Sequence, residues 1–225
     1  MSETQAVRVW DLPTRTFHWL LAACVLASIV SARIGGSAMV WHFRIGYVVF
    51  TLLAFRLLWG FTGGRWSRFR AFFYAPATSL RYLRGGSLPH EHHHVGHNPL
   101  GAWSVLALLA VLMAQVTTGL VADDEVASSG PLYRYVATAT SLAATRWHKG
   151  YGQWLIISLV IIHVGAIAFY WFRRRQNLLS PMLHGDKLLT ADVPASVDSA
   201  GSRLRALALV AVCAAGVAFI VSLEG

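Results

Sequence analysis

Five long runs of apolar residues, separated by polar segments, dominate the pattern of this chain. Each run has roughly the 20 residues that an α-helix needs to cross the hydrocarbon core of a bilayer. The pattern therefore predicts an all-α fold, an integral membrane helical bundle. We expect its five transmembrane helices at residues 13–33, 41–62, 99–121, 147–172 and 204–223.

The composition agrees with this class of protein. Of the 225 residues, 56% are hydrophobic and only 13% are charged, which is typical of membrane proteins. The first apolar run is longer than the core of a cleaved signal peptide, and the acidic residues Glu3 and Asp11 precede it. We therefore expect this run to remain as the first transmembrane helix.

The net charge of +9 would also suit a nucleic-acid-binding protein, but the placement of the basic residues argues for another explanation. They concentrate ahead of the first helix, in residues 63–98 and in residues 173–205. Basic loops lie on the cytoplasmic side of a membrane and bind lipid headgroups. We therefore expect a cytoplasmic N-terminus, a periplasmic C-terminus, contact with membrane lipid and no nucleic-acid partner.

Four histidines lie in or at the edge of the apolar runs: His18, His42, His148 and His163. An imidazole in hydrocarbon is costly, so such residues indicate a function. Because successive helices cross in opposite directions, His18 and His163 share the inner depth, and His42 and His148 share the outer depth. The fourth helix contains both His148 and His163, which are 15 residues apart. In an α-helix this spacing separates the two residues by about 22 Å along the axis and by a net rotation of roughly 60° around it.

Two histidines that face one another at equal depth are suited to the two axial positions of a haem iron. Helical bundles commonly hold such cofactors in their cores. The pattern predicts two haem groups, an inner one between His18 and His163 and an outer one between His42 and His148. Gly46, one turn after His42, would leave room for the flat macrocycle. A zinc site fits poorly, since zinc takes four ligands around one point.

The haem propionates need cationic partners. For the outer haem the candidates are Arg33, Arg44 and Lys149, and for the inner haem they are Arg15 and Arg56. Arg56 lies inside the second apolar run. Its side chain could instead reach out to the cytoplasmic interface, and this interpretation is weighted equally with a role as a propionate partner.

Other polar features leave more than one interpretation open. The histidine-rich tract from His90 to His97 is expected to be a solvated loop, with a weak metal site or the wall of a quinone pocket as alternatives. The two cysteines, Cys24 and Cys213, form no CxxC or CxxCH motif. Covalent c-type haem and iron–sulfur or zinc-ribbon sites are therefore excluded.

Several stretches resemble the bacterial cytochrome b561 superfamily, which includes the b-type cytochrome subunits of nickel–iron hydrogenases. The resemblance covers most of residues 7–190. It implies two b haems ligated from the first, second and fourth helices, electron transfer between quinone and a partner protein, and a place in the bacterial inner membrane. The stretches that carry it are Arg15–Trp19, Trp41–Tyr47, Gly96–Trp103, the pair His148 and His163, and Gln176–Lys187.

This resemblance and the hydrophobic pattern together predict the domain organisation. Residues 1–175 form a four-helix di-haem cytochrome b domain with a short helix in the outer loop near residues 132–144. Residues 176–202 form a cytoplasmic loop, and residues 203–225 form the fifth transmembrane helix.

The expected function is electron transfer across the membrane between the quinone pool and a periplasmic redox partner such as a c-type cytochrome. The stretch Gly96–Trp103 resembles family members that work with such cytochromes, and the acidic residues 123–125 would attract a basic one. Two alternatives remain: a superoxide oxidase that passes electrons to quinone, and a cytochrome b subunit of a hydrogenase or dehydrogenase complex. Whether the protein is itself an enzyme is left open.

Overall fold

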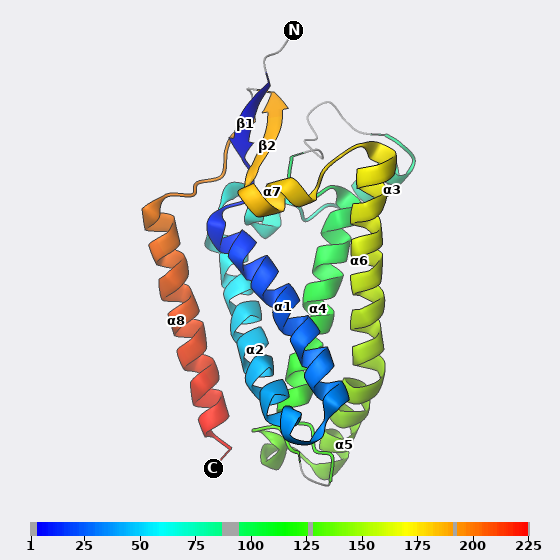
Figure 1. The fold of residues 1–225 in the computed structure, drawn as a ribbon, viewed down its shortest axis with the longest axis vertical. Helices are drawn as coiled ribbons and strands as arrows, with labels where there is room; N and C mark the ends of the chain where they lie inside the picture. The colour runs from blue at the N-terminus through cyan, green and yellow to red at the C-terminus, as the bar shows by residue number, and fades with distance from the viewer. Residues whose placement is uncertain (1–3, 87–94, 126–127, 191–192, 225) are drawn as a thin grey trace. The chain divides into compact units, whose positions relative to one another are not determined.

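The computed structural model describes residues 4–86, 95–125, 128–190 and 193–224. Within them, five helical segments are long and apolar enough to cross a membrane, which confirms the predicted number. The elements in chain order are β1 (Thr4–Arg8), α1 (Leu12–Ile34), α2 (Met39–Thr62), α3 (Pro76–Leu83), α4 (Pro99–Leu120), α5 (Thr138–Arg146), a π-helical turn (Trp147–Gly152), α6 (Gln153–Arg174), α7 (Leu179–His184), β2 (Asp186–Thr190) and α8 (Ala200–Ser222) (Figure 1).

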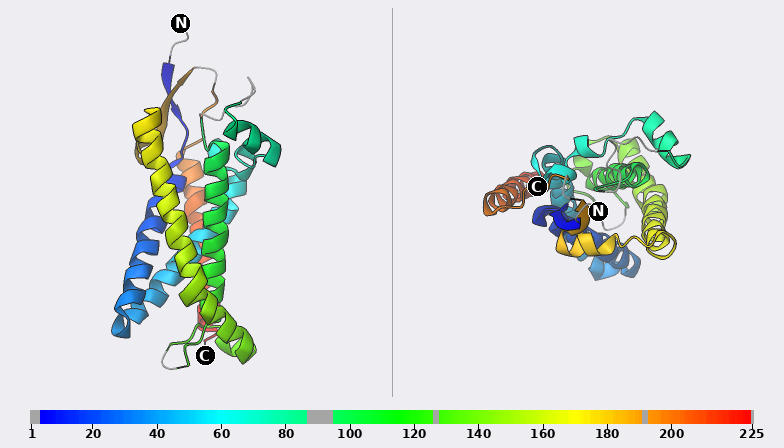
Figure 2. Two further views of the ribbon diagram at one scale, coloured as in Figure 1. Left: turned by 90° about the vertical axis from the view of Figure 1, so that its right-hand side faces the viewer. Right: turned by 90° about the horizontal axis from the view of Figure 1, so that it is seen from above.

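The prediction of a loop over residues 176–202 is wrong in part, because α7 and β2 lie inside it. Strand β2 pairs antiparallel with β1, from Thr4 opposite Thr190 to Arg8 opposite Asp186. Figure 2 shows this ribbon from a second side. Each strand is stabilised by hydrogen bonds to the other, which is far away in the sequence. The local sequence of either strand alone therefore does not predict it. The short helix expected in the outer loop is α5.

The chain folds as two compact units, and each of them is assembled from three stretches of sequence. Unit 1 consists of Met1–Phe17, Arg56–Leu106 and Ile162–Leu207, and unit 2 consists of His18–Phe55, Ala107–Ile161 and Ala208–Gly225. Every long helix therefore contributes residues to both units.

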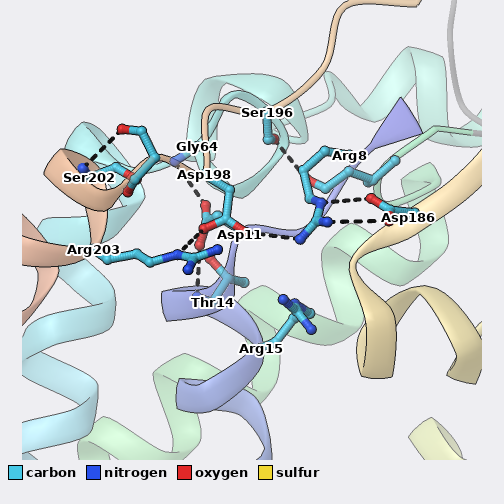
Figure 3. Close-up of polar contacts among 12 residues, drawn as sticks. Arg8, Asp11, Thr14, Arg15, Gly64, Asp186, Ser196, Asp198, Ser202 and Arg203 are labelled. Carbon is cyan, nitrogen blue, oxygen red and sulfur yellow. Dashed lines mark hydrogen bonds and ion pairs between the residues drawn. The ribbon is translucent and has the colours of Figure 1, made fainter. Parts of the chain in front are cut away.

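In unit 1 the carboxylate of Asp11 organises the start of α1. Asp11 is fully buried and accepts hydrogen bonds from the backbone N–H groups of Thr14 (2.8 Å) and Gly64 (2.9 Å) (Figure 3). It also accepts hydrogen bonds from the Ser67 hydroxyl (2.9 Å) and the Trp59 indole (3.2 Å). The bond to Thr14 is the N-terminal cap of the helix. With four donors, burial of this carboxylate is compensated.

Arginines and aspartates hold the β1–β2 ribbon and the start of α8 within the same unit. Arg8 forms ion pairs with Asp186 (2.6 Å) and Asp198 (2.9 Å), and Arg203 pairs with Asp198 at 2.9 Å (Figure 3). Burial alone would raise the pKa of Asp198, but the hydrogen bond from Arg203 and the charges of both arginines outweigh burial, so this pKa lies below its usual value. Val7 of β1 and Leu189 of β2 form an apolar cluster with Val9, Trp10, Val95 and Val193.

Unit 2 is built from helices that pack through large aliphatic side chains. Its core contains Val49 and Leu53 of α2, Leu112 of α4 and Ile156 of α6, with Leu21 of α1 packed against them. Many other apolar side chains of these helices are exposed, as the surface of a membrane span requires. The four helices of the predicted haem-binding core therefore all contribute to this unit.

Candidate functional site

The structure brings together the two histidines that were paired at the outer depth. His42 lies in the first turn of α2 and His148 in the π-helical turn, both in unit 2. Their ring centroids are 5.9 Å apart, and their planes stand at 88°. When two imidazoles bind opposite sides of one metal ion through bonds of about 2 Å, their ring centres are roughly 6 Å apart. The separation therefore fits two axial ligands of one metal ion.

Both imidazoles are held by backbone carbonyl groups. The Nδ1 atom of His42 lies 2.9 Å from the carbonyl oxygen of Ser28, and Nδ1 of His148 lies 2.8 Å from that of Gln115. A carbonyl oxygen only accepts, so each Nδ1 carries the proton. Each Nε2 keeps its lone pair, which is the arrangement that metal-ligating histidines adopt.

A cavity of about 640 Å³ in unit 2 is lined by both histidines. This volume lies in the range of cofactor pockets. Glycines help to keep it open: a β-carbon added at Gly46 would meet no atom within 4 Å, and one added at Gly119 would lie 2.8 Å from Cε1 of His148. The ligand atoms, the tautomers and the space all fit a haem b.

The cations at this cavity differ in part from the predicted ones. Arg33 and Lys149 line it, whereas Arg44 is not among its described lining residues and lies over the Trp41 ring at 5.2 Å. Lys149 forms an ion pair with Asp124, 3.7 Å from Nζ to the carboxylate. The structure thus favours Arg33 and Lys149 over Arg44 as partners of an anionic group in the cavity.

The two histidines of the inner pair belong to different units. His18 is in the unit 2 part of α1, with its ring edge-on to Trp19 at 5.1 Å, and His163 is in the unit 1 part of α6. Their pairing stays a prediction. The expected rotation between His148 and His163 assumed an unbroken α-helix, and that assumption is wrong because His148 lies in the π-helical turn Trp147–Gly152.

Arg56 does not reach out to the interface, because its side chain is only 3% exposed. Its guanidinium lies 5.0 Å from the Phe69 ring and 5.9 Å from the Phe72 ring, and Nη1 has no hydrogen-bond partner among the described residues. Arg15 donates from Nη1 to the Leu183 carbonyl at 2.6 Å, while its buried Nε has no partner in the described part of the chain. Both side chains therefore retain N–H groups that an acidic cofactor group would satisfy.

The histidine-rich tract is described only from residue 95 onwards, so His90–His94 lie outside the described residues. For His97 the prediction of a solvated side chain is wrong. Its ring packs against Trp10 at 4.8 Å and Phe72 at 4.7 Å, all within unit 1.

The acidic residues of the outer loop are used to hold the loop itself. The Asp123 carboxylate accepts a hydrogen bond from the Glu125 N–H at 2.9 Å, and the Asp124 carboxylate accepts one from the Ser128 N–H at 2.8 Å and pairs with Lys149. The ion pair with Lys149 offsets the charge of Asp124, so this loop has less net negative charge than its three acidic residues suggest.

Sequence reasoning missed the carbonyl partners Ser28 and Gln115. A main-chain carbonyl has no signature in the sequence, although Gln115 is a polar residue within a long apolar run. Within the described residues no group of three or more His, Cys, Asp or Glu side chains is placed to hold a metal ion.

Comparison with known proteins places this chain among membrane cytochromes. The family model described as "Prokaryotic cytochrome b561" matches residues 9–185. The "Probable Ni/Fe-hydrogenase B-type cytochrome subunit" of Rhizobium leguminosarum bv. viciae is 24% identical, covering 83% of this chain and 90% of the relative. The protein of the same description in Azotobacter chroococcum mcd 1 is 27% identical, covering 84% and 91%.

The "Probable Ni/Fe-hydrogenase 1 B-type cytochrome subunit" of Escherichia coli K12 is 25% identical, covering 79% of this chain and 88% of the relative. No solved structure gives a significant match. Since the family model extends over most of a chain with five apolar helices, the chain belongs to the prokaryotic cytochrome b561 family and is a membrane b-type cytochrome.

Proposed function

We propose that this cytochrome carries electrons across the bacterial inner membrane through two haem b groups. His42 and His148 hold the outer haem, and His18 and His163 hold the inner one. The observation that carries the proposal is the outer pair: two imidazoles 5.9 Å apart beside a cavity, each with Nδ1 bound to a carbonyl oxygen. For the inner pair the support is the matched depth in the sequence and the family.

Bound haem supplies one-electron exchange. Two histidine ligands leave no open coordination position on the iron, which favours electron transfer over oxygen activation. The chain's own residues then fix the plane, burial and surrounding charge on which the reduction potential depends. Arg33 and Lys149 at the outer cavity neutralise the propionates of the outer haem.

Arg15 and Arg56 serve the propionates of the inner haem in the same way. A buried guanidinium N–H group without an acceptor is costly, and both side chains contain one. A carboxylate is the group that would satisfy them, since it forms strong charge-assisted hydrogen bonds with arginine.

The electron path has membrane quinone at its cytoplasmic end and a redox protein at its periplasmic end. The basic segments support a cytoplasmic N-terminus and, with five spans, a periplasmic C-terminus. The partner is either a c-type cytochrome or a subunit of a larger complex. The descriptions of the relatives favour a cytochrome b subunit of a nickel–iron hydrogenase, and the ion pair of Asp124 with Lys149 weakens the argument for the c-type cytochrome.

The haem content of the purified chain tests the proposal. A reduced-minus-oxidised spectrum with haem extraction is expected to give two haem b per chain, and one or none would refute it. In isolated membranes, reduction of the haems by hydrogen supports the hydrogenase-type partner, whereas exchange only with a c-type cytochrome supports the other. Rapid reduction of the purified cytochrome by superoxide would instead support a superoxide oxidase.

A further inference from the structure

Gln115 of α4 contacts His148 in two ways. Its main-chain carbonyl oxygen accepts from Nδ1 of His148 at 2.8 Å, and its side-chain Nε2 donates to the main-chain carbonyl of His148 at 2.8 Å. The opposite amide orientation would set Oε1 against another oxygen with no proton between them, so Nε2 is the donor. One residue therefore holds both the ring and the backbone of His148.

The backbone of His148 needs such a partner because of where it lies. In the π-helical turn Trp147–Gly152 the hydrogen-bond pattern of the α-helix is interrupted, and interruptions of this kind occur frequently at functional sites. The Gln115 amide takes up the carbonyl of His148 at this interruption. Gly152 makes room for it, because a β-carbon there would collide with Oε1 of Gln115 and lie 2.8 Å from Nε1 of Trp147.

We propose that Gln115 is a positioning residue of the outer haem. Its side chain fixes the main chain at His148, which keeps Nδ1–H on the Gln115 carbonyl and holds the ring near perpendicular to that of His42, at 88°. A firm Nδ1–H···O bond makes imidazole a stronger ligand and stabilises ferric iron. Gln115 thereby lowers the reduction potential of the outer haem. This inference rests on the proposed ligation of haem by His148.

The experiment uses the purified full-length cytochrome with Gln115→Met, which keeps the length of the side chain but removes the donor. The matched control is Thr117→Val on the same helix, since the exposed Thr117 hydroxyl donates to the Met113 carbonyl of its own helix. Redox titration and electron paramagnetic resonance report on each haem separately. The inner haem serves as an internal measure of folding.

Gln115→Met is expected to raise the potential of the outer haem alone. The reduction equilibrium should change by up to about tenfold, which is about 59 mV for a one-electron couple. The low-spin signal of that haem should change with the angle between the ligand planes. Selective loss of the outer haem, with the control intact, would also support positioning, because supporting residues typically contribute 10–100-fold to metal affinity.

An unchanged potential and signal in Gln115→Met would overturn the inference while leaving the proposed function standing. So would equal shifts of both haems, which indicate a general disturbance of the bundle. If His148→Ala retains both haems, the proposed ligation fails and the inference fails with it.

Discussion

Two clusters of polar side chains, one around Asp11 in unit 1 and one around His42 and His148 in unit 2, are satisfied in opposite ways. In unit 1 the Asp11 carboxylate is surrounded by four donors, and Arg8 and Asp198 are paired. In unit 2, His42 and His148 are each bound by one backbone carbonyl at Nδ1, and a lone pair remains on Nε2 beside a cavity. A closed network stabilises the fold, whereas a group held on one side only is prepared for a ligand.

The most severe test of this comparison removes a ligand from unit 2. If His148 is a ligand of the outer haem as proposed, His148→Ala should eliminate one of two haem b groups per chain, because it removes the ligating imidazole, and leave the other haem spectroscopically intact. Haem extraction and redox titration measure the result. His184→Ala, at an exposed histidine of α7, is the control and should retain both. Loss of both haems, or of neither, would contradict the separate outer site.

A substitution in the closed network of unit 1 should affect stability instead of haem content. Asp11→Ala leaves buried donors without an acceptor, and we expect a loss of about 3 kcal/mol. Asp11→Asn retains one acceptor oxygen and should lose less. Thermal unfolding in detergent provides the measurement, with the outer haem spectrum of the folded fraction unchanged. If Asp11→Ala instead kept a normal melting temperature and lost a haem, the assignment of Asp11 to stability and not to haem binding would be wrong.

The space beside His148 can be tested without touching a ligand. In Gly119→Ala the new β-carbon would lie 2.8 Å from Cε1 of His148, so the ring must move. We expect haem to be released from the outer site about tenfold more readily, which is about 1.4 kcal/mol, when measured by haem transfer to an acceptor protein. Gly216→Ala in α8 has no atom within 4 Å and should behave as the wild type. If Gly119→Ala and Gly216→Ala released haem at equal rates, the close contact between helix α4 at Gly119 and the His148 ring would be excluded.

The smallest effect concerns Asp198 and depends on pH. Its pKa is lowered in the folded state, so its contribution is present above the ordinary carboxyl pKa of about 3.9 and is lost as pH falls through the lowered value. The side chains of its partners Arg8 and Arg203 are 31% and 47% exposed, so water limits the gain to about 1 kcal/mol or less. Melting temperatures of wild type and Asp198→Asn should differ near neutral pH and converge in acid. If the difference in melting temperature grew as the pH fell, the pKa of Asp198 would be raised in the folded state, which would contradict the prediction.

The sequence was sufficient for features that depend on long apolar runs. The five spans follow from their length, and the approach of His42 to His148 follows from the alternating direction of the helices. Features built from distant or main-chain partners were missed. Strand β2 forms because β1 is available, and the choice of Arg33 over Arg44 depends on which side of a helix end faces the cavity.

The same limit explains why Arg56 was ambiguous. A cation in an apolar run either extends to water or turns inward, and the sequence does not distinguish the two. The decision depends on Phe69 and Phe72, which follow the helix and place their rings beside the guanidinium. The aromatic rings and the nearby Asp11 carboxylate offset part of the cost of burying this charge.

The π-helical turn Trp147–Gly152 has a consequence for how such a site changes in evolution. A turn of this kind contains one residue more than the α-helix around it, and it rotates the preceding segment relative to the first turns of α6. His148 can therefore be redirected by gain or loss of a single residue, while the register of α6 beyond the turn is preserved. Under the proposed ligation, one helix then offers two ligand positions that mutation can adjust independently, so the outer site could adapt to a new partner while the rest of the span is kept.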